Sequence, residues 1–364
     1  MRVSSFFLSS FAILCLLLVF PPFSFSKTAE EILMEINKLS PAERQKRLEE
    51  AAKKEGIFKF ASNENQDLIT KYQNGFAARY PFLKVESWRA SGAKGVERIV
   101  LEHRAGKLDT DVIGVPFETA SYVKREGVFG RYFSPELRFY SDRFKDKEGY
   151  WVSNHFNIAV IAYNNKLVKL EEAPKDYPDA LHPKWKGDLS IDVEPDRAVM
   201  GWLVAWGEEK TRAYMKALMR NGATVRRGHT LQIQLLCAGE FKVAVELYAY
   251  RVAQLKHEKN CPLGMNFPNP TPGSTGSHVG LTKGAPHPHA AALFMDFVLG
   301  EEGSKLLAST GRLPACKGIK ALYEEVSNLE EKGVNLLMIP SEEADRLNPL
   351  AKKLMEDILI RRQM

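Results

Sequence analysis

Residues 57–88, IFKFASNENQDLITKYQNGFAARYPFLKVESW, contain the pattern that decides the fold. Two short runs rich in apolar residues, Ile57–Ala61 and Val85–Trp88, flank a stretch with helical periodicity, Leu68–Arg79. The alternation continues with a helix over Val96–Arg104 and a strand over Asp111–Val115. Strands that alternate with helices in this way predict βαβ units and a mostly parallel sheet.

A second α/β unit is predicted after a long extended stretch, Trp151–Tyr163. Its expected elements are a strand at Leu189–Val193, a helix from about Arg197 to Arg220, a helix at Thr230–Ala238 and a strand at Val243–Leu247. Residues 266–277 (NFPNPTPGSTGS) are rich in turn formers and predict a crossing between two lobes, and the last 50 residues predict helices. Two α/β lobes, each with helices flanking its sheet, place a ligand in the cleft between them.

The first 26 residues differ from the rest of the chain. Arg2 precedes an almost purely apolar run, Phe6–Phe20, which is too short for a membrane span and fits the core of a signal peptide. Small residues in the segment 24–26 (SFS) then favour cleavage before Lys27. This predicts export to the periplasm, and an uncleaved N-terminal anchor is the alternative.

The expected domain organisation follows from these segments. Residues 1–26 form the signal peptide, and 27–55 form an N-terminal helical extension in which Ser40-Pro41-Ala42-Glu43 has the pattern of a helix start. Lobe 1 comprises 56–160 plus about 268–315. Lobe 2 comprises 161–267 plus about 316–364, including C-terminal helices.

The composition is that of a globular protein. Of the 364 residues, 45% are hydrophobic and 26% are charged, which excludes collagen-like and strongly charged unfolded chains. The formal net charge of +6 comes from interspersed residues of both signs, so no nucleic-acid partner is expected. Cys237, Cys261 and Cys316 follow the signal peptide and allow at most one disulfide, whose pairing the sequence does not choose. A buried apolar role is expected for Cys237.

Several segments together resemble the extracellular solute-binding proteins of ABC importers, in the branch that includes ferric-ion, thiamine, polyamine and phosphonate binders. They extend over nearly all of residues 50–315, and they are AAKKEG at 51–56, FAARYP at 76–81, AYN at 162–164, APK at 173–175, HPKWKG at 182–187, AGE at 238–240, and KGAPHPHAA at 283–291 running through FMDF at 294–297 to EEG at 301–303. The resemblance implies a two-lobed type II periplasmic-binding-protein fold. It also implies a monomer that performs no chemistry, closes over a ligand by a hinge and delivers it to a permease in the inner membrane.

Two predicted helix starts are candidate anion sites. Ser91, Gly92 and Ala93 follow a strand and open a helix, so free backbone N–H groups there can bind an anion, although Ser91 can equally be a simple helix cap. Arg226, Arg227, His229 and Thr230 form a basic opening to another helix, with Thr230 as its expected N-cap. A pair of solvated charges is the alternative there. Further expected contacts are Ser62, Asn63, Phe117 and Asp192.

Tyr248 and Tyr250 share a strand face with Glu246 if the strand continues that far. In ferric-ion binders two adjacent tyrosines near this point donate phenolate oxygens to iron. Here Ala249 separates the two tyrosines, and Asn63 stands where ferric binders often have a histidine. Iron is therefore a weaker expectation than packing or aromatic stacking, and its candidate ligands are Glu64, Glu118, His229, Tyr248 and Tyr250. His287 and His289 alternate with prolines at a helix start and are not expected to bind metal.

These observations predict a periplasmic substrate-binding component of an ABC importer. Its ligand is expected to be small and anionic or a metal–anion pair, with ferric iron as a conceivable cargo rather than a cofactor. No catalytic motif is found, so the alternatives are a secreted hydrolase or metalloenzyme and a ligand-sensing domain of a membrane receptor.

Overall fold

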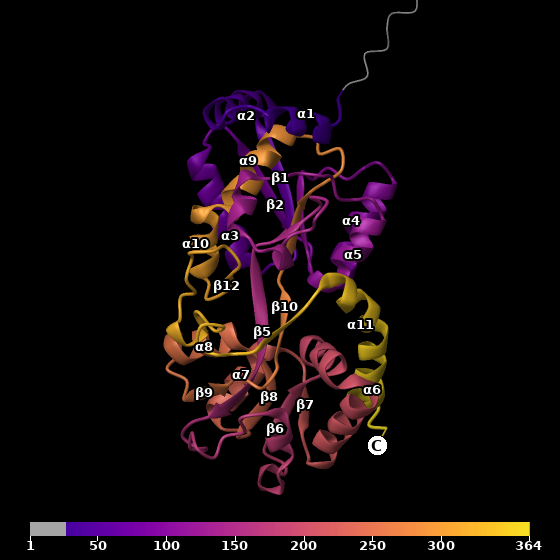
Figure 1. Ribbon diagram of the computed structural model, residues 1–364, viewed down its shortest axis with the longest axis vertical. Coiled ribbons are helices and arrows are strands. Elements are labelled where there is room, and N and C mark those ends of the chain that lie inside the picture. Colours follow the sequence, from indigo (N-terminus) through magenta and orange to yellow (C-terminus); the bar gives the residue numbers. More distant parts are fainter. Residues whose placement is uncertain (1–26, 364) are drawn as a thin grey trace, which may run out of the picture.

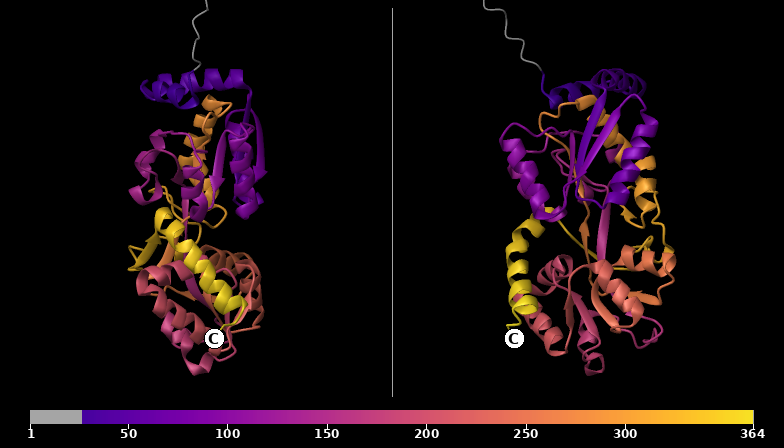
Figure 2. Two further views of the ribbon diagram at one scale, coloured as in Figure 1. Left: turned by 90° about the vertical axis from the view of Figure 1, so that its right-hand side faces the viewer. Right: turned by 180° about the vertical axis from the view of Figure 1, so that it is seen from behind.

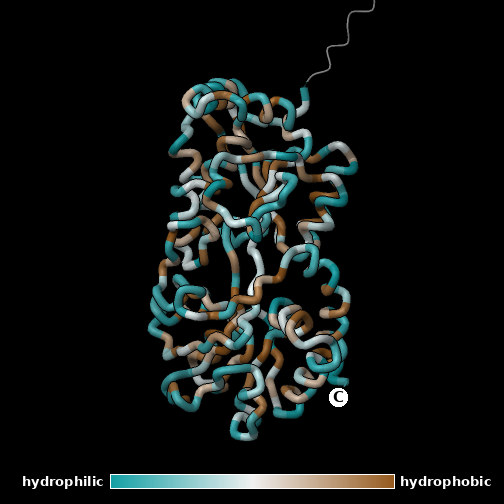
Figure 3. The backbone as a smooth tube through the Cα atoms, viewed as in Figure 1, coloured by the Kyte–Doolittle hydropathy of each residue, from teal (hydrophilic) through white to brown (hydrophobic). Residues whose placement is uncertain are grey.

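The computed structural model describes residues 27–363, and the predicted signal peptide lies outside the described residues. Two α/β lobes are stacked along the long axis of the molecule and are joined at a narrow waist (Figures 1 and 2). Hydrophobic residues are concentrated along the central strands of both lobes (Figure 3). Between residues 27 and 363, no helix combines the length and the apolar character that crossing a membrane requires.

Lobe 1 is built on a five-stranded sheet. Its order is β2 (Lys84–Arg89), β1 (Ile57–Ser62), β3 (Val112–Val115), β11 (His278–Leu281) and β4 (Val152–Ser153). β1 runs parallel to β2 and β3, whereas β11 is antiparallel to both β3 and β4. The connecting helices are α3 (Gln66–Arg79), α4 (Gly92–Arg104) and α5 (Phe117–Arg125). The βαβ alternation predicted from residues 57–115 is therefore confirmed.

The N-terminal extension forms two helices, α1 (Ala29–Ile36) and α2 (Pro41–Glu55). The predicted helix start at Ser40 is confirmed, because the Ser40 side chain accepts a hydrogen bond from Glu43 N and the Glu43 carboxylate accepts one from Ser40 N. The chain leaves α2 through Gly56 at φ 71°, a left-handed conformation that favours glycine. The extension packs on α9 (Pro288–Leu299) of lobe 1.

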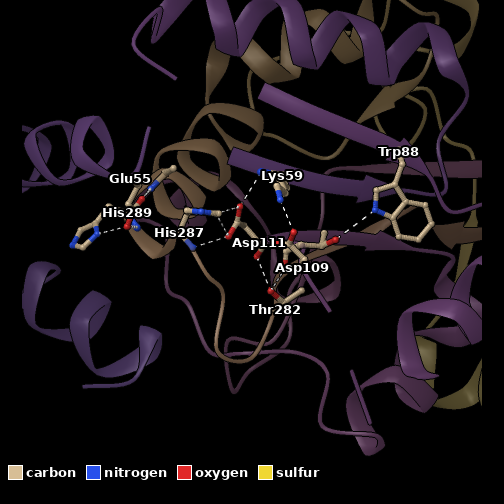
Figure 4. Close-up of polar contacts among 10 residues, drawn as sticks. Glu55, Lys59, Trp88, Asp109, Asp111, Thr282, His287 and His289 are labelled. Atoms are coloured by element: carbon tan, nitrogen blue, oxygen red, sulfur yellow. Dashed lines mark hydrogen bonds and ion pairs between the residues drawn. The ribbon is translucent and has the colours of Figure 1, made fainter. Parts of the chain in front are cut away.

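The two histidines at the start of α9 contact separate carboxylates (Figure 4). His287 Nδ1 lies 3.1 Å from an Asp111 oxygen, and His289 Nδ1 lies 2.6 Å from Glu55 Oε1. The same carboxylates accept hydrogen bonds from backbone N–H groups of the first turn of α9. These residues therefore fix the helix start and join it to α2 and β3.

Lobe 2 contains a mixed sheet. Its order is β13 (Leu336–Ile339), β10 (Thr271–Thr275), β5 (His155–Asn164), β8 (Val243–Tyr248), β6 (Leu189–Asp192) and β7 (Thr224–Arg226), and β9 (Leu263–Asn266) and β12 (Leu313–Pro314) also pair with β5. Alternate residues of β5 face opposite cores. Ala159 and Ile161 pack with α6 (Asp196–Arg220) and α11 (Ser341–Met355), whereas Ile158 and Val160 pack with α7 (His229–Ala238) and α8 (Ala249–Glu258).

The predicted crossing at residues 266–277 does contain a passage between the lobes at its C-terminal end, but two strands of the C-terminal third were not predicted. The turn-rich segment 266–277 contains strand β10, and the last 50 residues contain strand β13, which pairs in parallel with β10. Both strands are short, and their hydrogen-bonding partners lie far away in the sequence, so local patterns did not show them. A further helix, α10 (Glu301–Ala308), follows α9.

The cysteine pairing that the sequence left open is Cys237 with Cys261. This disulfide joins the end of α7 to the chain just before β9. The expected apolar role of Cys237 was therefore wrong, whereas Cys316 is a free, buried thiol.

The chain crosses between the lobes at three places, and the first two are neighbours. β4 of lobe 1 leads directly into β5 of lobe 2, and β10 of lobe 2 leads into β11 of lobe 1. These crossings lie at residues 153–155 and 275–278, a few residues from the expected boundaries near 160 and 268. Helix α11 packs against both α5 of lobe 1 and α6 of lobe 2. A third crossing follows α10, between Ala308 and Leu313, where the chain enters the lobe 2 sheet as β12. Lobe movement therefore bends three short backbone segments and repacks α11.

Candidate functional site

A cavity of about 500 Å³ lies between the lobes. Both sheets point the carboxyl ends of their parallel strands toward it: β1, β2 and β3 from lobe 1, and β6 and β8 from lobe 2. The charged residues that line this cleft are Glu64, Arg89, Glu118, His155, Arg197, Arg251 and Arg312. Strand ends and helix starts are where α/β folds bind ligands, so this cleft is the candidate ligand site.

Four arginines, Arg89, Arg197, Arg251 and Arg312, are the most conspicuous feature of the cleft and are called the cleft arginines below. Arg89 ends β2 and donates from Nε to the backbone oxygen of Glu64 at 2.8 Å. Arg251 lies in the first turn of α8 and donates to Thr230 Oγ1 at 3.2 Å. Within residues 27–363, neither of these two guanidinium groups forms an ion pair with a carboxylate.

Arg197 is the most unusual of the cleft arginines because it is only 7% exposed and also has no carboxylate partner among the described residues. Its guanidinium carbon lies 4.7 Å from the ring centre of Tyr248 and 5.4 Å from that of Phe117. It donates a hydrogen bond to Ser274 Oγ. Cation–π contacts compensate only part of the free-energy cost of burying a charge. The site therefore holds a cation that the described chain does not neutralise.

Arg312 is the exception, because it pairs with Glu64. Burial opposes ionisation of Glu64, but Arg312 and then His155 lower the pKa of this carboxyl below its usual range. Burial lowers the pKa of His155 to about 4, so His155 is neutral at pH 7 although its Nε2 lies 3.4 Å from Glu64. Arg312 Nε is buried and has no hydrogen-bond partner in the described chain.

Tyr248 and Tyr250 both line the cleft, with ring centroids 6.1 Å apart. The expectation that they share a strand face was wrong, because β8 ends at Tyr248 and Tyr250 belongs to the first turn of α8. The ring of His229 packs on Tyr248 at 3.8 Å from the other side. Burial raises the pKa of the Tyr248 phenol, and Arg197 only partly opposes this, so the phenol is protonated near neutral pH.

Two helix starts add backbone donors. α4 begins at Gly92 and α5 at Phe117, and both residues line the cleft. Neither helix has a side-chain hydrogen bond at its N-cap. The first-turn N–H groups of α4 thus remain available to a ligand, whereas in α5 Thr119 N already donates to Pro116 O. The helix dipoles favour an anion at these helix starts. Together with the cleft arginines, the arrangement is suited to bind negative charge.

Comparison with known proteins shows the family to which the chain belongs. Residues 118–346, more than half of the chain, match the family model described as bacterial extracellular solute-binding protein. The chain belongs to this family. The solute-binding protein also shares its two-lobed fold with type II periplasmic binding proteins, as predicted.

Among sequence relatives, iron uptake protein A1 of Synechocystis sp. (strain ATCC 27184 / PCC 6803 / Kazusa) is 30% identical over 192 residues, 48% of the solute-binding protein and 52% of the relative. The solute-binding protein spans about half to two thirds of the length of the curated relatives it matches.

Two solved structures illustrate the shared fold. Iron-bound HitA from Pseudomonas aeruginosa superposes with a TM-score of 0.73 at 18% identity, covering 83% of this chain and 99% of HitA. AfuA from Actinobacillus pleuropneumoniae, with fructose-6-phosphate bound, gives a TM-score of 0.68 at 22% identity and covers 84% of this chain and 99% of AfuA. At these identities the likeness concerns the fold.

The structure brings part of the predicted ligand set together. The predicted residues that line the cleft are Asn63, Glu64, Gly92, Phe117, Glu118, Thr230, Tyr248 and Tyr250. Those that do not line it are Ser62, Ser91, Ala93, Asp192, Arg226, Arg227 and His229. For the residues that line the cleft, contact with a ligand remains a prediction. The other residues lie outside the cavity.

The residues outside the cavity have local roles instead. Arg227 Nη1 pairs with Glu194 at 2.8 Å on the surface, and Arg226 is exposed on β7 at the edge of the sheet. Asp192 accepts hydrogen bonds from Gly228 N and Gln232 Nε2, at 2.9 and 2.8 Å, and so holds the loop before α7.

Other local roles complete this account. The hydroxyl of Ser62 accepts a hydrogen bond from Glu64 N at 3.2 Å. Ser91 is the N-cap of α4 without a side-chain bond, and Ala93 is exposed. Thr230 is not an N-cap, because α7 starts at His229 after Gly228.

The cleft arginines are the main residues that sequence reasoning missed. The rule that strand ends bind ligands could have found three of them. Arg89 ends β2, Arg251 follows the end of β8 by three residues, and Arg197 follows the end of β6 at the start of α6. Arg312 gave no such signal, because it meets Glu64 only through the folded chain.

Proposed function

We propose that this solute-binding protein is the periplasmic receptor of an ABC importer and captures a small anionic solute in the cleft between its lobes. The observation that carries this proposal is the buried Arg197, which has no carboxylate partner in the described chain; the half-buried Arg251 and the exposed Arg89 also lack one. A buried cation without a partner is costly in free energy unless a negative group from outside neutralises it. Membership of the solute-binding family supports a receptor, and the predicted signal peptide supports a periplasmic location.

The distribution of donors between the lobes explains how binding would cause closure. Arg89 and Gly92 belong to lobe 1, whereas Arg197, Arg251 and Thr230 belong to lobe 2. An anion that contacts both groups is bound more tightly when the lobes approach, so the ligand shifts the population toward the closed form. The protein performs no bond chemistry in this account. A permease in the inner membrane would receive the solute from the closed form.

A second candidate cargo is ferric iron bound together with an anion. It is favoured by Tyr248 and Tyr250, whose rings lie side by side in the cleft, and by the names of sequence relatives such as iron uptake protein A1. Phenolate oxygens suit a hard, highly charged cation. In this arrangement the tyrosines would hold the metal, and the cleft arginines would hold the anion.

The test is a binding screen with the protein purified from the periplasm of an expression host and freed of ligand. Phosphate esters, phosphonates, carboxylates and ferric citrate are compared by thermal shift. A ligand at 100 times its dissociation constant stabilises the folded state by about 2.7 kcal/mol, which gives a clear shift.

The outcomes separate the two candidates. Stabilisation by metal-free anions supports the anion receptor. A visible phenolate-to-iron absorption band that is lost in the Tyr248→Phe variant supports the ferric candidate. Turnover of any of these compounds would contradict both.

A further inference from the structure

The charges that line the cleft do not cancel. Its wall carries the four guanidinium groups of the cleft arginines and two carboxylates, those of Glu64 and Glu118. His155 is neutral because burial lowers its pKa to about 4. With both carboxylates ionised, the described lining has a formal excess of two positive charges; burial raises the pKa of the Glu118 carboxyl, which acts to increase this excess.

Acidic groups behind the wall do not remove this excess. Glu246 is 1% exposed, and burial raises its pKa well above the usual value, which favours the uncharged acid. Asp192 accepts hydrogen bonds from Gly228 and Gln232, which direct its carboxylate away from the cavity lining. Asp196 and Lys352 both lie close to Glu118. Their charges have opposite signs, so the two together do not change the net charge behind the wall.

The unused donors suit a group with several acceptor oxygens. Arg312 is 6% exposed, and its Nε has no hydrogen-bond partner in the described chain even though its Nη2 pairs with Glu64. A planar guanidinium fork matches the spacing of two oxygens on one phosphorus or carboxyl carbon. The first-turn N–H groups of α4 add neutral donors without adding charge.

From this charge balance, we propose that the cleft selects solutes with two negative charges. The group is either one phosphate or phosphonate dianion or two carboxylates on one small molecule. A dianion neutralises the formal excess of the lining, whereas a monoanion leaves more of the positive charge around the buried Arg197 and Arg312 uncompensated. This inference rests on the proposed function and specifies the chemical class of its cargo.

Matched pairs of probes test the inference by isothermal titration calorimetry at about pH 8, where a phosphate monoester is a dianion. Glucose 6-phosphate is compared with glucose 6-sulfate, which has the same skeleton and one charge, and succinate is compared with butyrate. At least one dianion should bind tenfold or more (about 1.4 kcal/mol) tighter than its monoanionic partner. The pair that shows this difference also distinguishes a phosphorus group from two carboxylates.

The opposite results are equally informative. If the probes bind but in neither pair does the dianion bind more than about threefold tighter than its monoanionic partner, the inference is overturned and the anion receptor stays intact. Binding of ferric citrate, with none of the four probes bound, overturns both the inference and the anion receptor.

Charge variants check that the selectivity comes from the lining. Arg251→Gln removes one positive charge from a half-buried position, so the lining then has an excess of one. Because the Coulomb energy scales with the ligand charge, the fold-loss for the dianion should be about the square of that for the monoanion. Equal fold-losses for both probes would contradict charge selection. The matched control is Arg212→Gln on α6, whose guanidinium pairs with Glu208 outside the cleft and which should bind like the wild type.

Discussion

Arg197 and Arg227 carry the same charged group on the same lobe, but their surroundings are opposite. Arg227 has a side chain that is 68% exposed, and it pairs with Glu194. Arg197 is 7% exposed, lies over the rings of Phe117 and Tyr248, and has no carboxylate partner in the described chain. Water and a neighbouring acid already compensate the first charge. The second requires a partner from outside, which is why a basic residue is informative only together with its environment.

The strongest way to test this contrast is to remove the buried charge. Arg197→Ala should weaken binding of the anionic solute by about a hundredfold or more, because truncating a buried charge partner in a complex costs 2–5 kcal/mol. Stability without ligand should change little, since no internal ion pair is broken. Calorimetry and thermal melting of the same preparation measure both. A large loss of stability with unchanged affinity would show that Arg197 serves the fold only.

A second test breaks the one ion pair inside the cleft. Glu64→Gln leaves Arg312 buried without its counter-charge, which should lower the free energy of unfolding by about 3 kcal/mol. Affinity for the anion should rise, because the ligand can then compensate Arg312 as well. Denaturant unfolding and calorimetry measure the two effects. Loss of both stability and affinity would mean that Glu64 positions the ligand directly.

The buried histidine beside this pair gives a pH test. Burial lowers the pKa of His155 to about 4, from an ordinary value near 6.5. Between about pH 6.5 and pH 4 the unfolded chain binds a proton at this residue that the folded chain does not, so acidification destabilises the fold. Asp111, whose pKa burial raises to about 6, acts in the opposite direction over part of this range.

The comparison with a variant isolates the histidine. The stability advantage of the wild type over His155→Gln should therefore shrink as the pH falls from about 6.5 to 4. Thermal melts at several pH values measure it. A constant difference across this range would show that His155 does not resist protonation.

The smallest expected effect is that of replacing Arg227, the exposed arginine of the pair, on the affinity for the anion. Arg227→Ala removes an exposed guanidinium outside the cavity, so affinity for the anion should stay within about twofold of the wild type. Calorimetry under the same conditions measures it. A large loss of affinity would show that the basic loop at residues 226–227 contacts the ligand. It would contradict the conclusion that the buried Arg197 binds the anion and the exposed Arg227 does not.

Much of the fold was predictable because its signals are local. The strand–helix–strand pattern of residues 57–88 and the cap at Ser40 each depend on neighbours within a few turns of chain. Strands β10 and β13 were missed because they are short and pair with segments far away in the sequence. The disulfide between Cys237 and Cys261 was also open, because local sequence does not show which cysteines meet.

The sequence predicted where the candidate site lies, but it predicted only some of the residues that form it. Gly92, Thr230 and the two tyrosines were found because each lies near a strand end or a helix start. The same rule selected Arg226 and Arg227, which the edge position of β7 leaves on the surface. It would also have selected Arg89 and Arg197, so strand ends alone do not distinguish cleft residues from surface residues.

By itself, the sequence determined the two α/β lobes, the start of α2 and the resemblance to solute-binding proteins, because these features rest on periodicity, capping residues and short segments. The tertiary structure alone decided which charges meet. Glu64 and Arg312 lie far apart in the chain yet form the ion pair of the cleft, whereas Arg197 reaches the same cavity without a carboxylate partner in the described chain. The physical reason is that the energy of a charge depends on its burial and on neighbours that only the folded chain brings together.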